Sequence, residues 1–264
     1  MDLQLNNKTA FISGSTSGIG FAIAKTLLLE GAEVILNGRT QKNIDLATRP
    51  LKVLVPDAKI SGIVADFRNP GAMDFVKQKI DQVDILINNV GIYASKSFEK
   101  TSSDEWQEMF DVNVMSAVKL SAYFLPKMKA KNWGRIIFIS SECAQLVPDD
   151  LIAYSTTKAA ILALSRGLAQ TTKGTNVTVN ALVPGSTLTE GAQEFLKNQA
   201  AIEQRSEDEV AGDFFKQVRT TSLIQRFAHP KEIADMAVFL ASPLSSATNG
   251  AAIKVDGGSI PGIF

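Results

Sequence analysis

The sequence predicts an α/β protein in which a doubly wound parallel sheet carries helices on both of its faces. Two observations predict this class. Strand-like runs with apolar centres alternate with helix-like runs along the chain, and parallel strands need such centres because helices bury both faces of the sheet. A glycine-rich turn, Ser13–Gly20, joins the first strand-like run to the first helix-like run. Doubly wound sheets that bind dinucleotides carry their phosphate-binding turn at this position.

Length and composition limit the domain count and the partners. The chain has 264 residues, of which 45% are hydrophobic and 20% charged, as is typical of globular proteins. Because α/β domains often reach ~250 residues undivided, we expect a single domain over residues 1–264. The 27 basic and 27 acidic residues cancel, so no net field attracts nucleic acid or a membrane surface, and we expect neither as a partner.

Cysteine content and hydropathy bear on the compartment. The single Cys143 excludes an intrachain disulfide and leaves nothing for a zinc cluster, so we expect no metal site and a reducing compartment. Met1–Lys8 lacks the apolar core of a signal peptide, and no run approaches the ~18 apolar residues of a membrane span. We therefore expect a cytoplasmic protein.

The glycine turn follows a strand over Lys8–Ile12 and leads into a helix over Phe21–Glu30. Gly14, Gly18 and Gly20 remove side chains where the chain turns sharply, and let a ligand approach the backbone. The first helical amides are unpaired and lie at the positive end of the helix dipole, so the turn suits a pyrophosphate. The spacing differs from the commoner Gly-x-Gly-x-x-Gly, and a turn without a ligand is the alternative.

The second strand, Glu33–Asn37, ends beside a basic residue. In dinucleotide-binding folds the end of this strand faces the adenosine ribose, where an acid binds the 2′-hydroxyl and repels a 2′-phosphate. The residues here are Gly38-Arg39-Thr40, and none is acidic. Since Arg39 can pair with a phosphate and stack on adenine, the sequence favours NADP, with NAD as the second choice. The alternative is a solvated surface arginine.

A third strand is predicted over Ile60–Ala65. It lies between a helix over Lys42–Leu54 and a helix over Pro70–Ile80, with proline in the first turn of the latter. Asp66 stands at the end of the strand. Its carboxylate is able to accept a hydrogen bond from the adenine amino group, or to cap the following turn, as aspartate commonly does.

The fourth strand, Asp84–Asn88, ends in Asn88-Asn89-Val90-Gly91. Amide side chains donate and accept hydrogen bonds, so these two asparagines can tie neighbouring strand ends together beside a cofactor. A purely structural role is the alternative.

A long helix follows, opening at a capping box of Ser102 with Glu105 and reaching about Phe124. Asn113 falls inside it, although asparagine is a mediocre helix former because its side chain competes for backbone hydrogen bonds. Two interpretations are open. Asn113 marks a kink whose freed carbonyl holds water, or it is a polar residue that faces solvent.

The fifth strand, Arg135–Ser140, delivers Ser141 to the carboxyl end of the sheet. Tyr154 and Lys158 are four positions apart in the next helix, which runs to about Gln170, so they share one helical face. A phenol titrates near pH ~10. A nearby ammonium group and an oxidised nicotinamide stabilise the phenolate, which would lower the pKa toward that of an efficient general acid or base. A Tyr-x-x-x-Lys pair also occurs by chance on many helices.

The last third of the chain contains a predicted insertion. A sixth strand over Asn176–Val183 ends in Pro184–Thr189, and residues 190–226 are polar and helical. Two helices here form a lid over a substrate in one interpretation and ordinary surface helices in the other. A last helix over Pro230–Ala241 and a last strand over Ala251–Val255 complete the pattern.

In the order of these motifs, the chain resembles the short-chain dehydrogenase/reductase family over residues 8–258. Ser13–Gly20 is similar to the family's Thr-Gly-x-x-x-Gly-Ile-Gly turn, with serine in place of the threonine. Asn88–Gly91 is similar to its Asn-Asn-Ala-Gly stretch, with Val90 in place of alanine. The resemblance implies a Rossmann-like sheet of seven strands in the order 3-2-1-4-5-6-7.

The resemblance also implies hydride transfer between NADP(H) and a small-molecule carbonyl or secondary alcohol. In it, Tyr154 is the acid/base, Lys158 lowers its pKa and binds the nicotinamide ribose, Ser141 polarises the carbonyl, and Asn113 holds a relay water. The implied cofactor-binding residues, besides Tyr154 and Lys158, are Gly14, Ser15, Ser17, Gly18, Ile19, Gly20, Arg39, Asp66, Asn88, Gly91, Pro184, Gly185, Thr187 and Thr189.

Two further features follow from the resemblance. Members that prefer NADP often have a basic residue where Arg39 is, and another before the second glycine, where this chain has Ser17. Members are usually homotetramers, packed through the helices that carry Asn113 and Tyr154.

Three other functions are compatible with single features of the chain to different degrees. A 3-oxoacyl-carrier-protein reductase is a specialisation of the same chemistry, but residues 190–226 are long for its lid. A non-catalytic NADP-binding regulator would not need Ser141, Tyr154 and Lys158. A Ser-His-Asp hydrolase needs a histidine base, and the single His229 directly precedes Pro230, as expected at a helix start.

Overall fold

Seven strands of the described residues form one parallel sheet. The computed structural model describes residues 1–263. The sheet order is β3-β2-β1-β4-β5-β6-β7, with parallel pairing throughout, so the expected order is confirmed. The strands are β1 Thr9–Ile12, β2 Glu33–Gly38, β3 Ile60–Val64, β4 Ile85–Asn88, β5 Gly134–Ile139, β6 Val177–Pro184 and β7 Ala252–Val255.

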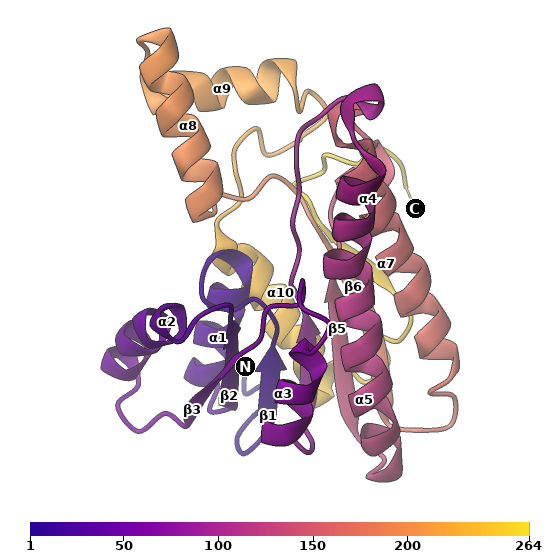
Figure 1. The fold of residues 1–264 in the computed structure, drawn as a ribbon. Helices are drawn as coiled ribbons and strands as arrows, with labels where there is room; N and C mark the ends of the chain where they lie inside the picture. Colours follow the sequence, from indigo (N-terminus) through magenta and orange to yellow (C-terminus); the bar gives the residue numbers. More distant parts are fainter. Residues whose placement is uncertain (264) are drawn as a thin grey trace.

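Helices cover both faces of the sheet (Figure 1). Helices α1, α2 and α10 contribute to the apolar core on one face, and α3, α5 and α7 to the core on the other, which confirms the doubly wound class. The helices are α1 Gly18–Leu29, α2 Gln41–Leu54, α3 Ala72–Lys79, α4 Ser103–Phe110, α5 Ser116–Ala130, α6 Cys143–Leu146, α7 Ile152–Gln170, α8 Glu190–Glu203, α9 Glu207–Gln217 and α10 Pro230–Ala241.

Alternate residues of the central strands supply the two cores. In β1, Ala10 and Ile12 belong to the core beneath α1 and α10, whereas Phe11 belongs to the opposite core. There the Phe11 ring lies 6.1 Å from the ring of Phe124 in α5. Side chains alternate because the strand period is two, and burying each large apolar side chain stabilises the fold by about 1.5–3 kcal/mol. The buried sheet therefore fixes the positions of the residues at its carboxyl edge.

The helix predicted over Pro70–Ile80 is shorter in the structure. Helix α3 begins at Ala72 after Gly71, so Pro70 precedes the helix rather than lying in its first turn. Two consecutive turns explain the difference, because Asn69 N donates to Asp66 O and Ala72 N donates to Asn69 O.

The long helix predicted to reach Phe124 is broken and extends further. It consists of α4, a π-helical segment over Asp111–Met115, and α5, which ends at Ala130. The capping box of Ser102 and Glu105 at its start is present. A π segment replaces the α-helical hydrogen bonds locally and often marks a functional site. The helix is therefore distorted at Asn113, while the water held by a freed carbonyl stays a prediction.

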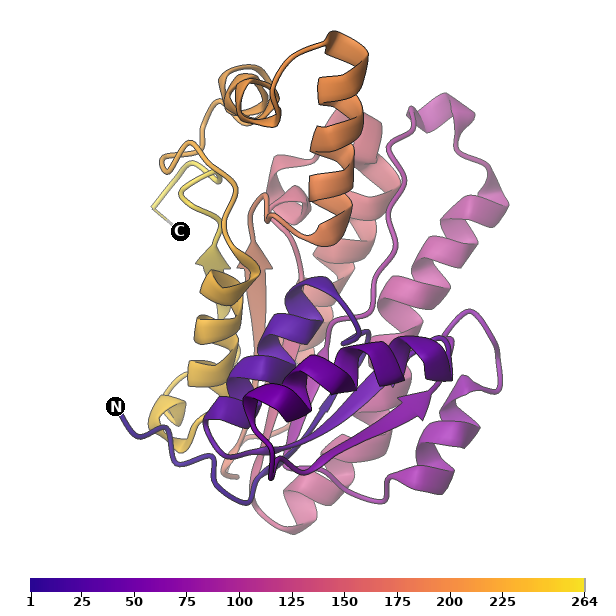
Figure 2. The same cartoon turned by 90° about the vertical axis from the view of Figure 1, so that its left-hand side faces the viewer.

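Helices α8 and α9 stand apart from the two helical layers (Figures 1 and 2). They pack on each other through a small apolar cluster that includes Leu196, Ala200 and Val210. The prediction of two helices within residues 190–226 is confirmed. Within residues 1–263, we find no helix whose length and apolar character would let it span a bilayer.

Candidate active site

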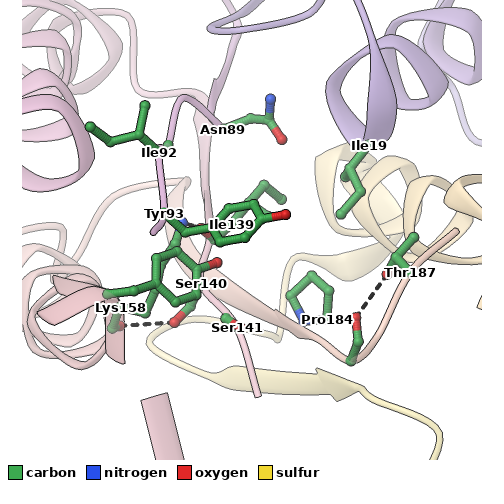
Figure 3. A pocket seen from close by; sticks show the side chains of 13 residues that line it. Ile19, Asn89, Ile92, Tyr93, Ile139, Ser140, Ser141, Lys158, Pro184 and Thr187 are labelled. Carbon is green, nitrogen blue, oxygen red and sulfur yellow. Dashed lines mark hydrogen bonds between the residues drawn. The ribbon is translucent and has the colours of Figure 1, made fainter. Parts of the chain in front are cut away.

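Two adjoining cavities open at the carboxyl ends of the strands. The smaller has a volume of about 170 Å³, and Ser141, Tyr154 and Lys158 are among its lining residues (Figure 3). The larger has a volume of about 650 Å³ and lies over the glycine turn and the ends of β2 and β3. Both are lined by the segment 91–93 and Asn89, so an extended ligand can pass from one to the other.

The smaller cavity brings together the three residues expected to act on a substrate. Ser141 directly follows β5, and its Oγ accepts a 3.1 Å hydrogen bond from Cys143 N at the start of α6. Tyr154 and Lys158 project from the first turns of α7, and Lys158 Nζ lies 5.6 Å from the centre of the Tyr154 ring. Tyr93 packs edge-on against the Tyr154 ring, with 5.9 Å between the centroids.

Desolvation dominates the ionisation of these groups in the chain by itself. It raises the pKa of Tyr154, and a side-chain hydrogen bond with Ser141 acts in the opposite direction. It also lowers the pKa of Lys158 to about 8. The expected lowering of the Tyr154 pKa is therefore not a property of the chain alone, because burial outweighs the favourable contacts. An added positive charge at the cavity would be needed to reverse it.

Asn113 is buried behind this site rather than exposed. Its side-chain Oδ1 accepts from Ile92 N at 2.7 Å, and its Nδ2 donates to Ile92 O at 2.9 Å and to Thr157 Oγ1 at 3.0 Å. The side chain thus joins the π segment to the loop after β4 and to α7. The interpretation of a solvent-facing residue is wrong, because the side chain satisfies two backbone groups of the loop that lines both cavities.

The glycine turn provides the cradle expected for a pyrophosphate. Gly14 and Gly18 have φ values of +63° and +57°, which residues with a Cβ rarely adopt. Both line the larger cavity together with Ser17, while Ile19 lines the smaller one. The amide of Gly18 donates at 2.8 Å to a carboxylate oxygen of Glu190. This contact shows that the amide faces outward and is able to bind an oxyanion.

The end of β2 and the end of β3 form the far side of the larger cavity. Arg39 and Arg68 line it with exposed side chains, and Asp66 lines it with a partly buried one. Arg68 donates to Asp66 Oδ1 through Nε at 3.0 Å and through its backbone N at 3.1 Å, and the guanidinium holds the pKa of Asp66 below its usual range. Asp66 therefore caps its own turn, and its contact with adenine stays a prediction.

The polar residues that tie the strand ends together differ in part from those predicted. Asn89 Nδ2 donates to Ser13 O at 3.0 Å and to Gly14 O at 2.8 Å. Asn88 instead faces α5, where its Nδ2 donates to Ser121 Oγ at 3.3 Å, and it is not among the lining residues of the two cavities. Of the two asparagines, Asn89 is the one that reaches the cavities.

Two more residues of this region serve the framework. Ser15 is fully buried, and its Oγ donates to Ile12 O at 2.8 Å and accepts from Asn37 N at 2.9 Å. Asn37, which the sequence analysis noted only as a strand end, accepts from Gly14 N at 2.9 Å and donates to Ile63 O and Ala65 O. The signal in the sequence was a polar residue at the end of an apolar run.

The loop after β6 supplies the remaining predicted residues. Pro184, Gly185 and Thr187 line the smaller cavity, and Thr187 Oγ1 donates to Gly185 O at 2.8 Å (Figure 3). Thr189 lines the larger cavity and caps α8, accepting from Ala192 N. Hence this loop borders both cavities and leads directly into α8.

The chain is similar to known proteins over most of its length. The sequence model described as short chain dehydrogenase matches residues 8–200. The oxidoreductase YvrD of Bacillus subtilis is 47% identical over 98% of this chain and 99% of its own length. The 3alpha-hydroxysteroid dehydrogenase of Mediterraneibacter gnavus is 33% identical over 97% of this chain and 98% of its own length.

A solved structure is similar over the whole chain. L-Sorbose reductase from Gluconobacter frateurii, determined as a complex with NADPH and L-sorbose, superposes with a TM-score of 0.93 at 31% identity and covers 100% of both chains.

Proposed function

The chain belongs to the short chain dehydrogenase family, and on this premise we propose that it transfers a hydride between NADP(H) and a small-molecule carbonyl or secondary alcohol. Members of the family are oxidoreductases that act on such groups. The observation that carries the proposal is the presence of Ser141, Tyr154 and Lys158 in the wall of one cavity that continues into the glycine turn.

The residues of the smaller cavity have separate tasks. A bound NADPH supplies the hydride. The Ser141 hydroxyl donates a hydrogen bond to the substrate carbonyl oxygen and holds the substrate in place. Tyr154 gives that oxygen its proton during reduction and takes the proton back during oxidation. Lys158, when protonated, stabilises the tyrosinate that forms. Asn113 holds Ile92 and α7 in register, so these groups keep their positions.

NADP is the proposed cofactor, with NAD as the second choice. The residues fit the group, because the outward Gly18 amide, the positive φ values of the turn and the open cavity leave room for a pyrophosphate. Arg39 lines the same cavity, and its guanidinium would pair with a 2′-phosphate. Ser17 lines the same cavity, whereas Ser15 and Asn88 act behind it. The similarity to an NADPH-bound reductase supports the choice.

Two features of the whole protein belong to the proposal. Helices α8 and α9 form a lid within a single domain, since the loop that carries Thr187 and Thr189 leads into α8. The protein forms a homotetramer through the helical face that includes α5 and α7. Cys143 is a free, buried thiol, which suits a reducing compartment such as the cytoplasm.

The test is NADPH oxidation against a panel of ketones, aldehydes, hydroxylated ketones and 3-oxoacyl thioesters, with Tyr154→Phe measured beside the native protein. We expect turnover that falls by about 100-fold or more in the variant, with NADPH binding retained in a fluorescence titration. Tyr123→Phe is the matched control, because the Tyr123 hydroxyl donates to Ile80 O in the framework, away from the cavities. Binding of NADPH without turnover of any substrate would favour a regulator.

A further inference from the structure

A buried ion pair joins the turn after Ser141 to the segment after α9. Glu142 directly follows Ser141, and its Oε1 accepts from Arg219 Nε at 2.8 Å. Both side chains are largely shielded from solvent, with 3% of Glu142 and 11% of Arg219 exposed. The other ion pairs of the described residues have at least one partner that is considerably more exposed. A pair this well buried holds two segments together with little competition from water.

Glu142 links three loops at the carboxyl edge of the sheet. Its backbone N donates to Pro184 O at 2.8 Å, and its Oε1 also accepts from Ser186 Oγ at 3.0 Å. Its Oε2 is buried and has no partner among the described residues. Arg219 is thus the cation that compensates this carboxylate, and its removal would leave a charge that is buried and only partly hydrogen-bonded.

Arg219 reaches the Ser141 turn by a second path. Its Nη2 lies 3.8 Å from Cys143 Sγ, and Cys143 N donates to Ser141 Oγ. On the outer side, the guanidinium lies 5.6 Å from the ring centre of Phe214 in α9. Arg219 does not line the smaller cavity. Any influence on the reaction therefore passes through Glu142 and Cys143.

Four titratable groups from three places interact with Tyr154. Lys158 lies on the same helix, Tyr93 comes from the loop after β4, and Glu142 and Cys143 come from the turn after β5. Glu142 and Cys143 each act to raise the pKa of Tyr154. At Cys143, Arg219 acts to lower the pKa and Glu142 to raise it. Glu142 and Arg219 therefore have opposite electrostatic effects on the Cys143 thiol.

On the basis of the proposed function, we propose that Arg219 is a positioning residue for the hydride transfer. Its ion pair with Glu142 joins the Ser141 turn to the base of the lid and compensates the carboxylate of the residue that directly follows Ser141. Glu142 is the second member of the same device. Neither residue contacts the reacting atoms.

The test compares Arg219→Met, Glu142→Gln and the double variant with the native protein. The readout is the pH dependence of kcat/KM for alcohol oxidation, in which Tyr154 must lose its proton. Arg219→Met leaves the carboxylate uncompensated, so we expect the rising limb at higher pH and a loss of roughly 10- to 100-fold in kcat/KM at neutral pH. Glu142→Gln leaves the guanidinium uncompensated, so we expect kcat/KM of this variant to rise at a lower pH than in the native protein. In the double variant, the rise in kcat/KM returns toward its native pH.

Arg205→Met is the matched control. Arg205 lies in the same lid and is more exposed than Arg219, and its ion pairs join only residues of the lid, Glu203 and Asp213. We expect kcat/KM of Arg205→Met to rise at the same pH as in the native protein. The proposal would be overturned if kcat/KM rose at the native pH in both single variants, or if Arg205→Met shifted that pH by as much as Arg219→Met does. If Arg219→Met does not fold, Glu142→Gln still tests the sign of the shift.

A second measurement does not depend on turnover. Cys143 is the one cysteine of the chain, so the NMR chemical shift of its ¹³C-labelled Cβ follows the ionisation of this buried thiol without interference from other thiols and without a reagent that must reach it. We expect the pH midpoint of this titration to be higher than native in Arg219→Met, lower in Glu142→Gln and near native in the double variant. If the midpoints shift but the protein turns over no carbonyl compound, the proposed function is wrong, while the charge compensation between Arg219 and Glu142 still holds. Native midpoints in both single variants would refute the inference itself.

Discussion

Lys158 Nζ donates a 2.9 Å hydrogen bond to the carbonyl oxygen of Ile139, while it lies 5.6 Å from the centre of the Tyr154 ring. The ammonium group is thus held by the end of β5, the strand that also delivers Ser141. Only 4% of the lysine is exposed. The position of the cation is therefore fixed by the sheet, and the carbonyl offsets only part of the cost of burying it.

This burial predicts an unusual pH dependence of stability. The pKa of Lys158 is about 8 in the folded chain against 10.5 for an ordinary lysine, so between these values the unfolded state binds more protons. Stability then rises with pH through this window, by up to about 3 kcal/mol. Urea unfolding of the native protein and Lys158→Met from pH 7.5 to 10.5 measures the effect as a difference between the two. A difference that does not change with pH would contradict it.

Arg39 predicts the choice of cofactor. Arg39→Ala should weaken NADPH binding by about 10- to 100-fold, the range of a charge-assisted hydrogen bond to phosphate, and leave NADH binding nearly unchanged. Fluorescence titration with each cofactor gives the two dissociation constants. Arg49→Ala is the control, because Arg49 is an exposed residue of α2 that does not line the larger cavity. Equal losses for NADPH and NADH would show that Arg39 does not contact the 2′-phosphate.

Two glycines, Gly20 and Gly167, allow the effect of close packing on stability to be distinguished from the effect of helix propensity. A Cβ at Gly20 would lie 2.5 Å from Gly14 O and from Asn89 Nδ2, so Gly20→Ala should destabilise the protein by about 1–3 kcal/mol and weaken NADPH binding. A Cβ at Gly167, inside α7, would meet no atom within 4 Å, so Gly167→Ala should stabilise the protein by about 0.5–1 kcal/mol. Thermal unfolding measures both, and similar effects of the two changes would refute the packing argument.

The alternation of strands and helices, and the shared helical face of Tyr154 and Lys158, were predictable because they depend on local patterns. The strand order and the grouping of these two residues with Ser141 followed instead from the resemblance to a known family. Apolar strand centres, helix caps and the four-residue spacing each act over short stretches of sequence. By contrast, the ion pair of Glu142 and Arg219 joins residues 77 positions apart. No local pattern identifies such a pair, since it depends on how the lid returns to the sheet.

Local patterns also left some choices open. Asn88 and Asn89 are adjacent amides, and sequence alone does not tell which of them faces the cavity. The turn after β4 decides it, by directing Asn89 toward Ser13 and Gly14. Similarly, a mid-helix Asn113 is compatible with solvent or with a kink. The structure decides between them, because the Asn113 side chain pairs with the backbone N and O of Ile92, which lies 21 positions away in the sequence.

Glu190 predicts a link between the lid and the glycine turn. Its carboxylate accepts the 2.8 Å hydrogen bond from Gly18 N, at the end of α1 where a negative charge is favoured by the helix dipole. A pyrophosphate seeks the same donors, so the carboxylate competes with it. Glu190→Gln should therefore tighten NADPH binding by about 2- to 5-fold, the equivalent of the 0.3–1 kcal/mol that such a charge contributes.

Glu194→Gln is the matched control for this effect. It lies one helical turn further along α8 with an exposed side chain, so it changes the net charge of the lid equally without reaching α1. The tightening in Glu190→Gln should also decrease with added salt, because screening weakens the competing carboxylate in the native protein. Weaker binding in Glu190→Gln, or the same tightening in Glu194→Gln, would show that the carboxylate does not compete at the turn.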